Sequence, residues 1–263
     1  ALLSQYQPTD EQQAVRQVWA LYAVGGLEAV RAAGLDSIDA PLWVRFWMIQ
    51  LAADEPAPWS PSLRQQIAQQ LSQPTPLIIR SLASTCQRRI RLGHTDDVRE
   101  LLVQLLQRGE TVVEKSHANQ PTDEHRDQHA DHDNDDDAEL LATLKWYAVE
   151  PLVASESDWV LQLLPSMVAP EVQHSIARRL VTIDGGLERL TGVWREHPQA
   201  AWLADSIAGV LTATDGIVRQ DPPSGWSETY VALQQNPNQD VRQRARQLGS
   251  LFGDEHAIEA YRS

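Results

Sequence analysis

The side chains best suited to chemistry in this chain are three histidines within an acidic run near its middle. His125, His129 and His132 stand among aspartates that include Asp133. If this segment were helical, His125 and His129 would share one face at positions i and i+4, a spacing that can chelate Zn²⁺, Ni²⁺ or Cu²⁺. The candidate metal ligands are therefore His125, His129, His132 and Asp133, for a weakly held divalent ion.

The composition of the same run favours a different interpretation, a solvated insertion. Residues 114–137 show no apolar periodicity, and residues 115–137 contain no aliphatic side chain larger than alanine. Such a segment buries too little surface to offset the entropy that it loses on ordering. It also lacks packed neighbours that could orient the imidazoles. We therefore expect residues 114–137 to form a disordered acidic loop between two helices.

Outside this run the sequence contains no catalytic pattern. It lacks the Gly-x-Ser-x-Gly, P-loop, dinucleotide-binding and His-Glu-x-x-His motifs. Cys86 is the only cysteine, which excludes an internal disulfide and a c-type haem attachment site within this chain. We expect no catalytic residue and no cofactor-binding residue in the chain itself.

The charge of the chain argues against two classes of partner. The net charge is −14, and residues 116–139 contribute −8 of it through nine acidic side chains and one arginine. No basic stripe is present to neutralise phosphates, so we expect no nucleic-acid binding. No apolar run reaches 18 residues, so we expect no membrane insertion.

The elements that must position any site are helices. Apolar residues recur at spacings of three and four, and no stretch alternates with a period of two. Capping residues and prolines punctuate about a dozen short helices joined by short loops, an arrangement suited to antiparallel pairs. We expect an all-α fold with helical hairpins over 1–113 and over 138–263, forming one continuous array that the insertion interrupts. The nine tryptophans are expected to pack between the helices.

An aliphatic residue followed by arginine recurs in these helices. It occurs at Val44-Arg45, Ile79-Arg80 and Val241-Arg242, and Arg45 and Arg80 are 35 positions apart. Recurrence on this scale is typical of stacked helical hairpins and predicts a HEAT-like α-α superhelix. We expect the aliphatic side chain to pack between helices and the arginine to bridge to an acidic residue of the next unit.

Glu150 is the remaining candidate. It lies in a strongly apolar helical stretch just before Pro151. A buried carboxylate needs a partner, and Arg178 or Arg179 could supply it. A perturbed acid in a groove is the functional alternative, but a structural ion pair between adjacent hairpins is the interpretation that we favour.

The middle of the chain resembles a known family. The stretch LKWYAVEPLV at 144–153, followed by IARRL at 176–180, is similar to the helical region of the large planctomycetal haem-binding proteins, often labelled membrane-bound dehydrogenases. Shorter similar stretches lie at 18–22, 44–47, 82–84 and 251–254. In that family HEAT-like helices lie between a dehydrogenase-like β-propeller and a cytochrome c domain. The resemblance implies an extracytoplasmic or periplasmic setting, with haem c in another domain of a parent protein.

Together these observations predict a non-catalytic helical scaffold that presents a concave face to protein domains, in cis or in trans. Two alternatives stay open at this point. The chain could capture a metal through the His/Asp run, or it could be part of an oxidoreductase whose active site lies in other domains. The residues with predicted structural roles are Arg45, Arg80, Glu150, Arg178 and Arg242.

Overall fold

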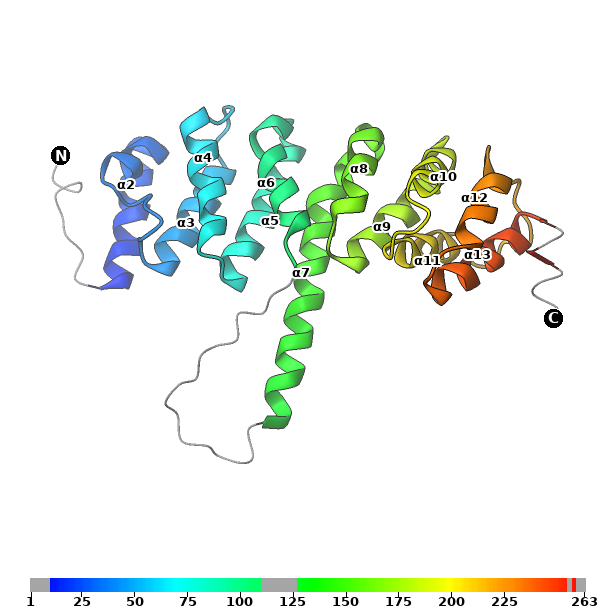
Figure 1. Ribbon diagram of the computed structural model, residues 1–263. Helices are drawn as coiled ribbons and strands as arrows, with labels where there is room; N and C mark the ends of the chain where they lie inside the picture. The colour runs from blue at the N-terminus through cyan, green and yellow to red at the C-terminus, as the bar shows by residue number, and fades with distance from the viewer. Residues whose placement is uncertain (1–9, 110–126, 255–256, 259–263) are drawn as a thin grey trace. The chain divides into compact units, whose positions relative to one another are not determined.

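The computed structural model describes the backbone of residues 10–109, 127–254 and 257–258 (Figure 1). These residues form twelve α-helices and two 3₁₀ turns, and they contain no strand. The all-α prediction is therefore confirmed. Within these residues, none of the helices combines the length and the apolar character needed to cross a bilayer.

The chain divides into two compact units. Unit 1 comprises residues 1–105 and 110–148, and unit 2 comprises residues 106–109 and 149–263. The divisions fall inside two helices, α6 (Thr95–Gln107) and α7 (Asp127–Ser155). The boundaries of the compact units therefore differ from the predicted segments 1–113, 114–137 and 138–263.

Unit 1 begins with a row of helices. They are α2 (Glu11–Ala32), α3 (Leu42–Ala53), α4 (Pro61–Gln69), the 3₁₀ turn η1 (Gln70–Ser72) and α5 (Pro76–Arg91). The side chains of Asp10, Ser60 and Thr75 accept hydrogen bonds from free N–H groups in the first turns of α2, α4 and α5. Helix α3 packs against both α2 and α5. Local capping chemistry therefore marks where α2, α4 and α5 begin, whereas α3 follows Pro41 without a side-chain cap.

Helix α2 is interrupted at two adjacent glycines, Gly25 and Gly26. Gly26 adopts φ +64° and ψ −164°, a conformation open to glycine and strained for other residues. The chain therefore turns here between two helical halves.

Helix α7 begins earlier than the sequence analysis predicts. It begins at Asp127 rather than at Ala138, and it continues through Pro151 to Ser155. The prediction of an irregular chain is therefore wrong for residues 127–137. Helix propagation from an existing helix costs far less than nucleation, and the aspartates at its start complement the positive end of the helix dipole.

Unit 2 contains six helices that pack in two rows. They are α8 (Ser157–Leu163), α9 (Pro170–Leu180), α10 (Gly186–Glu196), α11 (Leu203–Ala213), α12 (Trp226–Gln234) and α13 (Gln239–Leu251), with the 3₁₀ turn η2 (Leu164–Ser166) after α8. Helix α11 lies between α9 and α13, and α10 lies between α8 and α12. Figure 1 shows the two rows one above the other.

A glycine permits a close approach of α9 and α11 in unit 2. A Cβ atom built on Gly209 of α11 would lie 2.1 Å from the backbone oxygen of His174 on α9. That distance is far below van der Waals contact, so any larger residue must push α9 and α11 apart. Gly192 on α10 has no such neighbour within 4 Å.

A buried ion pair ties the α3–α4 connection to α5 and α6 in unit 1. Arg89 is fully buried, and its guanidinium donates to a carboxylate oxygen of Asp97 and to the backbone oxygens of Glu55 and Ala57. Asp97 also accepts a hydrogen bond of 3.0 Å from the backbone N–H of Trp59. The Arg89 guanidinium lies 5.2 Å from the centre of the Trp59 ring.

We predict that Gly209→Ala destabilises the protein by about 1–3 kcal/mol, because the new methyl group overpacks the α9–α11 contact. Gly192→Ala is the matched control and should stabilise by roughly 0.5–1 kcal/mol, since it only reduces backbone freedom in a helix. Urea denaturation of both variants measures the difference. Equal effects from the two substitutions would contradict the close approach at Gly209.

We also predict that Asp97→Ala lowers the free energy of unfolding by about 3–5 kcal/mol, because it leaves the Arg89 charge buried without its partner. The control is Asp54→Ala, which removes an exposed ion pair with Arg88 of 2.6 Å. Such a surface pair contributes about 1 kcal/mol or less. A similar small loss for both variants in chemical denaturation would show that the Arg89–Asp97 pair is unimportant.

Candidate functional site

The predicted metal ligands lie largely outside what the structure describes. His125 falls outside the described residues, and only the helical backbone is described for His129, His132 and Asp133, in α7. Among the described side chains, no group of three or more histidine, cysteine or carboxylate residues is placed to hold a metal. Metal binding by the acidic run stays a prediction.

Two of the recurring arginines contact backbone oxygens rather than acidic residues. Arg45 is 5% exposed and donates to the side-chain oxygen of Gln70 at 2.7 Å and to the backbone oxygens of Gln70 and Gln73 at 3.2 and 2.9 Å. Burial lowers the pKa of Arg45 below its ordinary value. Arg242 donates to the backbone oxygens of Asn236 and Pro237 at 2.6 and 2.8 Å.

The expected bridge to a carboxylate is therefore wrong for Arg45 and Arg242. Each of them is the fourth residue of its helix, α3 or α13. A cation in the first turn of a helix interacts unfavourably with the helix dipole. The hydrogen bonds from each guanidinium to carbonyl groups of a nearby connection offset this cost. Arg80 lies half-buried on α5.

The predicted partner of Glu150 is present. The Nε atom of Arg179 lies 3.8 Å from a carboxylate oxygen of Glu150, and the two side chains are 44% and 35% exposed. Arg178 is exposed on the same helix. Because both partners reach solvent, this pair contributes little to stability. Glu150 is thus not the deeply buried acid that its apolar surroundings in the sequence indicate.

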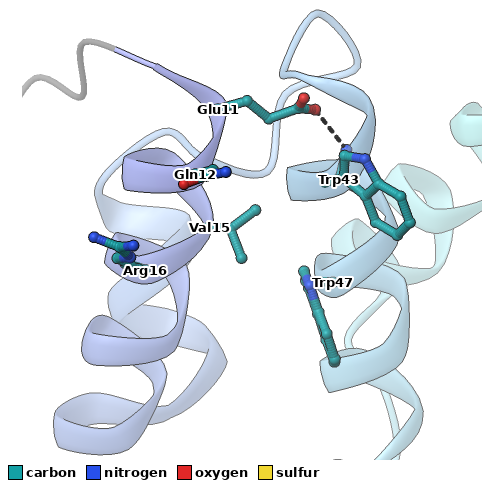
Figure 2. A pocket seen from close by; sticks show the side chains of 6 residues that line it. All are labelled: Glu11, Gln12, Val15, Arg16, Trp43 and Trp47. Carbon is teal, nitrogen blue, oxygen red and sulfur yellow. Dashed lines mark hydrogen bonds between the residues drawn. The ribbon is translucent and has the colours of Figure 1, made fainter.

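The candidate site is a pocket between α2 and α3 of unit 1 (Figure 2). It encloses about 420 Å³, within the range of small-ligand and side-chain pockets. Its lining residues are Glu11, Gln12, Val15, Arg16, Trp43 and Trp47. Figure 2 shows Val15 between the two helices and Glu11 reaching across to α3.

An aromatic cluster forms the α3 side of this pocket and continues onto α2. The ring centres of Trp19 and Trp47 are 4.6 Å apart in an edge-to-face arrangement, and Phe46 contacts both Trp43 and Trp47 edge-to-face at 5.6 and 5.2 Å. Trp19 is 42% exposed and Trp43 is 47% exposed. Adjacent exposed indoles of this kind are typical of interaction sites.

The two charged side chains of the pocket differ in their hydrogen bonding. A carboxylate oxygen of Glu11 accepts a 3.0 Å hydrogen bond from the backbone N–H of Trp43, which links the start of α2 to the first turn of α3. Arg16 is exposed and makes no hydrogen bond or ion pair with the residues that the structure describes. The pocket therefore offers apolar rings beside two charges, the Glu11 carboxylate, which is held by α3, and the Arg16 guanidinium, which has no partner among the described residues.

Sequence reasoning missed this site because it treated every tryptophan as a packing residue. That is correct for Trp59, Trp194 and Trp226, which are 3%, 0% and 3% exposed. The available signal was the spacing of Trp43 and Trp47, which places both indoles on one face of a helix. Their exposure depends on what packs beside α3, and the sequence of α3 alone does not reveal it.

A second group of ionisable side chains lies on α9, α11 and α13 of unit 2. Burial is the main cause that raises the pKa of Asp205, and burial together with the nearby Arg178 lowers the pKa of His174. Arg244 lies 3.9 Å from Asp205 and donates to the backbone oxygen of Ala204. These groups connect neighbouring helices.

Comparison with known proteins returns no match among family models, curated proteins or solved structures. The resemblance to planctomycetal haem-binding proteins therefore stays a prediction. What the described residues offer is a binding pocket, with aromatic surface and charge but without an assembled nucleophile, base or metal cluster in the described part.

The lowered pKa of His174 predicts a pH effect on stability. Below the ordinary histidine pKa, the unfolded chain binds a proton that folded His174 does not, so stability falls as pH drops from about 7 to about 5. His174→Gln should make the free energy of unfolding depend less steeply on pH. One group can contribute at most about 1.4 kcal/mol per pH unit to this slope, and the substitution should remove a fraction of that amount. Denaturation across this pH range tests it, with His197→Gln as control. An unchanged slope in His174→Gln would refute the assignment.

Proposed function

We propose that this chain is a non-catalytic helical-repeat module of HEAT-like type that binds a protein partner, in cis or in trans, at the α2/α3 pocket. The observation that carries the proposal is the pair of solvent-exposed indoles, Trp19 and Trp43, beside a pocket of about 420 Å³. Leaving this much aromatic surface in water costs free energy that a partner would recover.

The helix packing supports the repeat interpretation. In unit 2 the odd-numbered helices α9, α11 and α13 are successive neighbours, and so are the even-numbered helices α8, α10 and α12. Each hairpin thus contacts its sequence neighbours, as in quasi-one-dimensional repeat arrays. Arg45 and Arg242 also occupy the same position in their helices and both donate to backbone carbonyl groups of a connection, which supports a repeated unit.

The setting in a larger haem-binding, dehydrogenase-like protein is a further part of the proposal, supported by the stretch at 144–153. The encoded sequence on both sides of this chain tests it. An upstream strand-rich region and a downstream Cys-x-x-Cys-His motif support it, and stop codons at both ends refute it.

Site-specific photo-crosslinking tests the interaction function. We expect a photoreactive residue at position 12, which lines the pocket, to give one discrete adduct in the source cells. The matched control is position 188, which is exposed on α10 in unit 2. Mass spectrometry should identify one protein segment attached at position 12, and Trp43→Ala should abolish the adduct.

Equal labelling at positions 12 and 188, or labelling that Trp43→Ala leaves unchanged, would contradict a partner site at this pocket. Enzymatic turnover by the purified chain would contradict the non-catalytic assignment.

A further inference from the structure

The hydrogen-bonding state of the indoles around the pocket indicates what kind of partner segment it takes. The indole N–H of buried Trp59 donates to the backbone oxygen of Ala52 at 2.8 Å, and that of Trp194 donates to Ser206 at 2.9 Å. Trp19, Trp43 and Trp47 have no acceptor for their indole N–H groups among the described residues. An indole can only donate, so the pocket presents the two donors of Trp43 and Trp47, with that of Trp19 beside them, and favours a ligand rich in acceptors.

Backbone carbonyl groups are the acceptors that a protein partner can supply, and its conformation decides whether they are free. In an α-helix the interior carbonyls are occupied by the helix's own N–H groups. In a polyproline II segment no internal hydrogen bonds form, and every carbonyl points to its surroundings. Proline rings also pack flat on exposed aromatic side chains, as in the aromatic grooves that recognise proline-rich peptides.

The charge at the rim adds a second requirement. The carboxylate of Glu11 is engaged by the backbone of Trp43 at 3.0 Å. Arg16 lines the same pocket and has no partner among the described residues. A guanidinium in this state pairs best with a carboxylate, so the complementary ligand carries an acidic side chain.

We propose that the α2/α3 pocket binds an extended, proline-rich peptide segment whose acidic residue pairs with Arg16. This inference rests on the proposed interaction function and specifies its partner. The indoles of Trp43 and Trp47 donate to the peptide carbonyls, and Trp19, which packs against Trp47, extends the aromatic surface for the proline rings. The pocket volume of about 420 Å³ limits the contact to a short segment.

The test is a titration of the ¹⁵N-labelled chain with synthetic peptides, followed by the indole N–H resonances. The probe is a ten-residue peptide rich in proline with one central aspartate. The controls are the same peptide with lysine in place of aspartate and an amphipathic helical peptide of equal charge. We expect the aspartate peptide to shift the resonances of Trp19, Trp43 and Trp47 and to leave those of Trp59 and Trp194 in place.

Charge reversal tests the Arg16 contact without disturbing the core, since Arg16 is exposed. We expect Arg16→Glu to lower the affinity for the aspartate peptide by about five-fold, the size of effect that an exposed ion pair gives. The same substitution should raise the affinity for the lysine peptide. Arg91→Glu, at an exposed site on α5, is the matched control and should change neither affinity.

Indole resonances that do not move with the proline-rich peptide would overturn this inference. If the helical peptide shifts them instead, the pocket binds a helix, and the interaction function stands while this inference fails. If only an oligosaccharide such as cellohexaose shifts them, both the inference and the proposed protein partner fail.

Discussion

The structure depends on one recurring constraint, which is that the backbone carbonyls between helices need donors. Long polar side chains from neighbouring helices supply them in both units. Arg45, Arg89 and Arg242 each donate to two or more oxygens, mostly backbone carbonyls of an interhelical connection. Asn236, which is 1% exposed, does the same for the backbone oxygens of Pro198 and Ala200 at 2.7 and 3.4 Å. Unpaired carbonyls at these positions would each cost free energy, so these side chains fix both the loops and the spacing of the helices.

Helix α3 is held in place by contacts on the side away from its exposed aromatic residues. Arg45 points from α3 toward η1 and anchors that side of the helix, while Val44 and Ile49 are fully buried. The opposite side carries Trp43, and Glu11 holds its backbone to the start of α2. The pocket is therefore positioned by backbone contacts of α3 together with the packing of Trp47 against Trp19 of α2. A site built in this way can bind and release a partner without disturbing the core.

Much of the helix pattern was predictable because it follows from local chemistry. Ser60 and the proline after it mark the start of α4, and Gly25-Gly26 marks the interruption of α2. The ion pair between Glu150 and Arg179 was predictable because an acidic residue in an apolar helix needs a partner, and a basic residue follows on a nearby helix. The acceptors of Arg45 and Arg242 were not predictable, because a backbone oxygen carries no residue-type signal. The start of α7 at Asp127 depends on propagation from the helix that follows, which the composition of the acidic run alone does not reveal.

The central claim is that the exposed indoles of α2 and α3 are covered by a partner when the protein works. Hydroxyl-radical footprinting of the purified chain and of the same chain in its source cells tests this most directly. We predict ready oxidation of Trp19 and Trp43 in the purified chain and protection of both in cells. Tyr147, which is 47% exposed on α7, serves as the reference and should react equally in the two samples. Equal oxidation of Trp19 and Trp43 in both samples would contradict the claim.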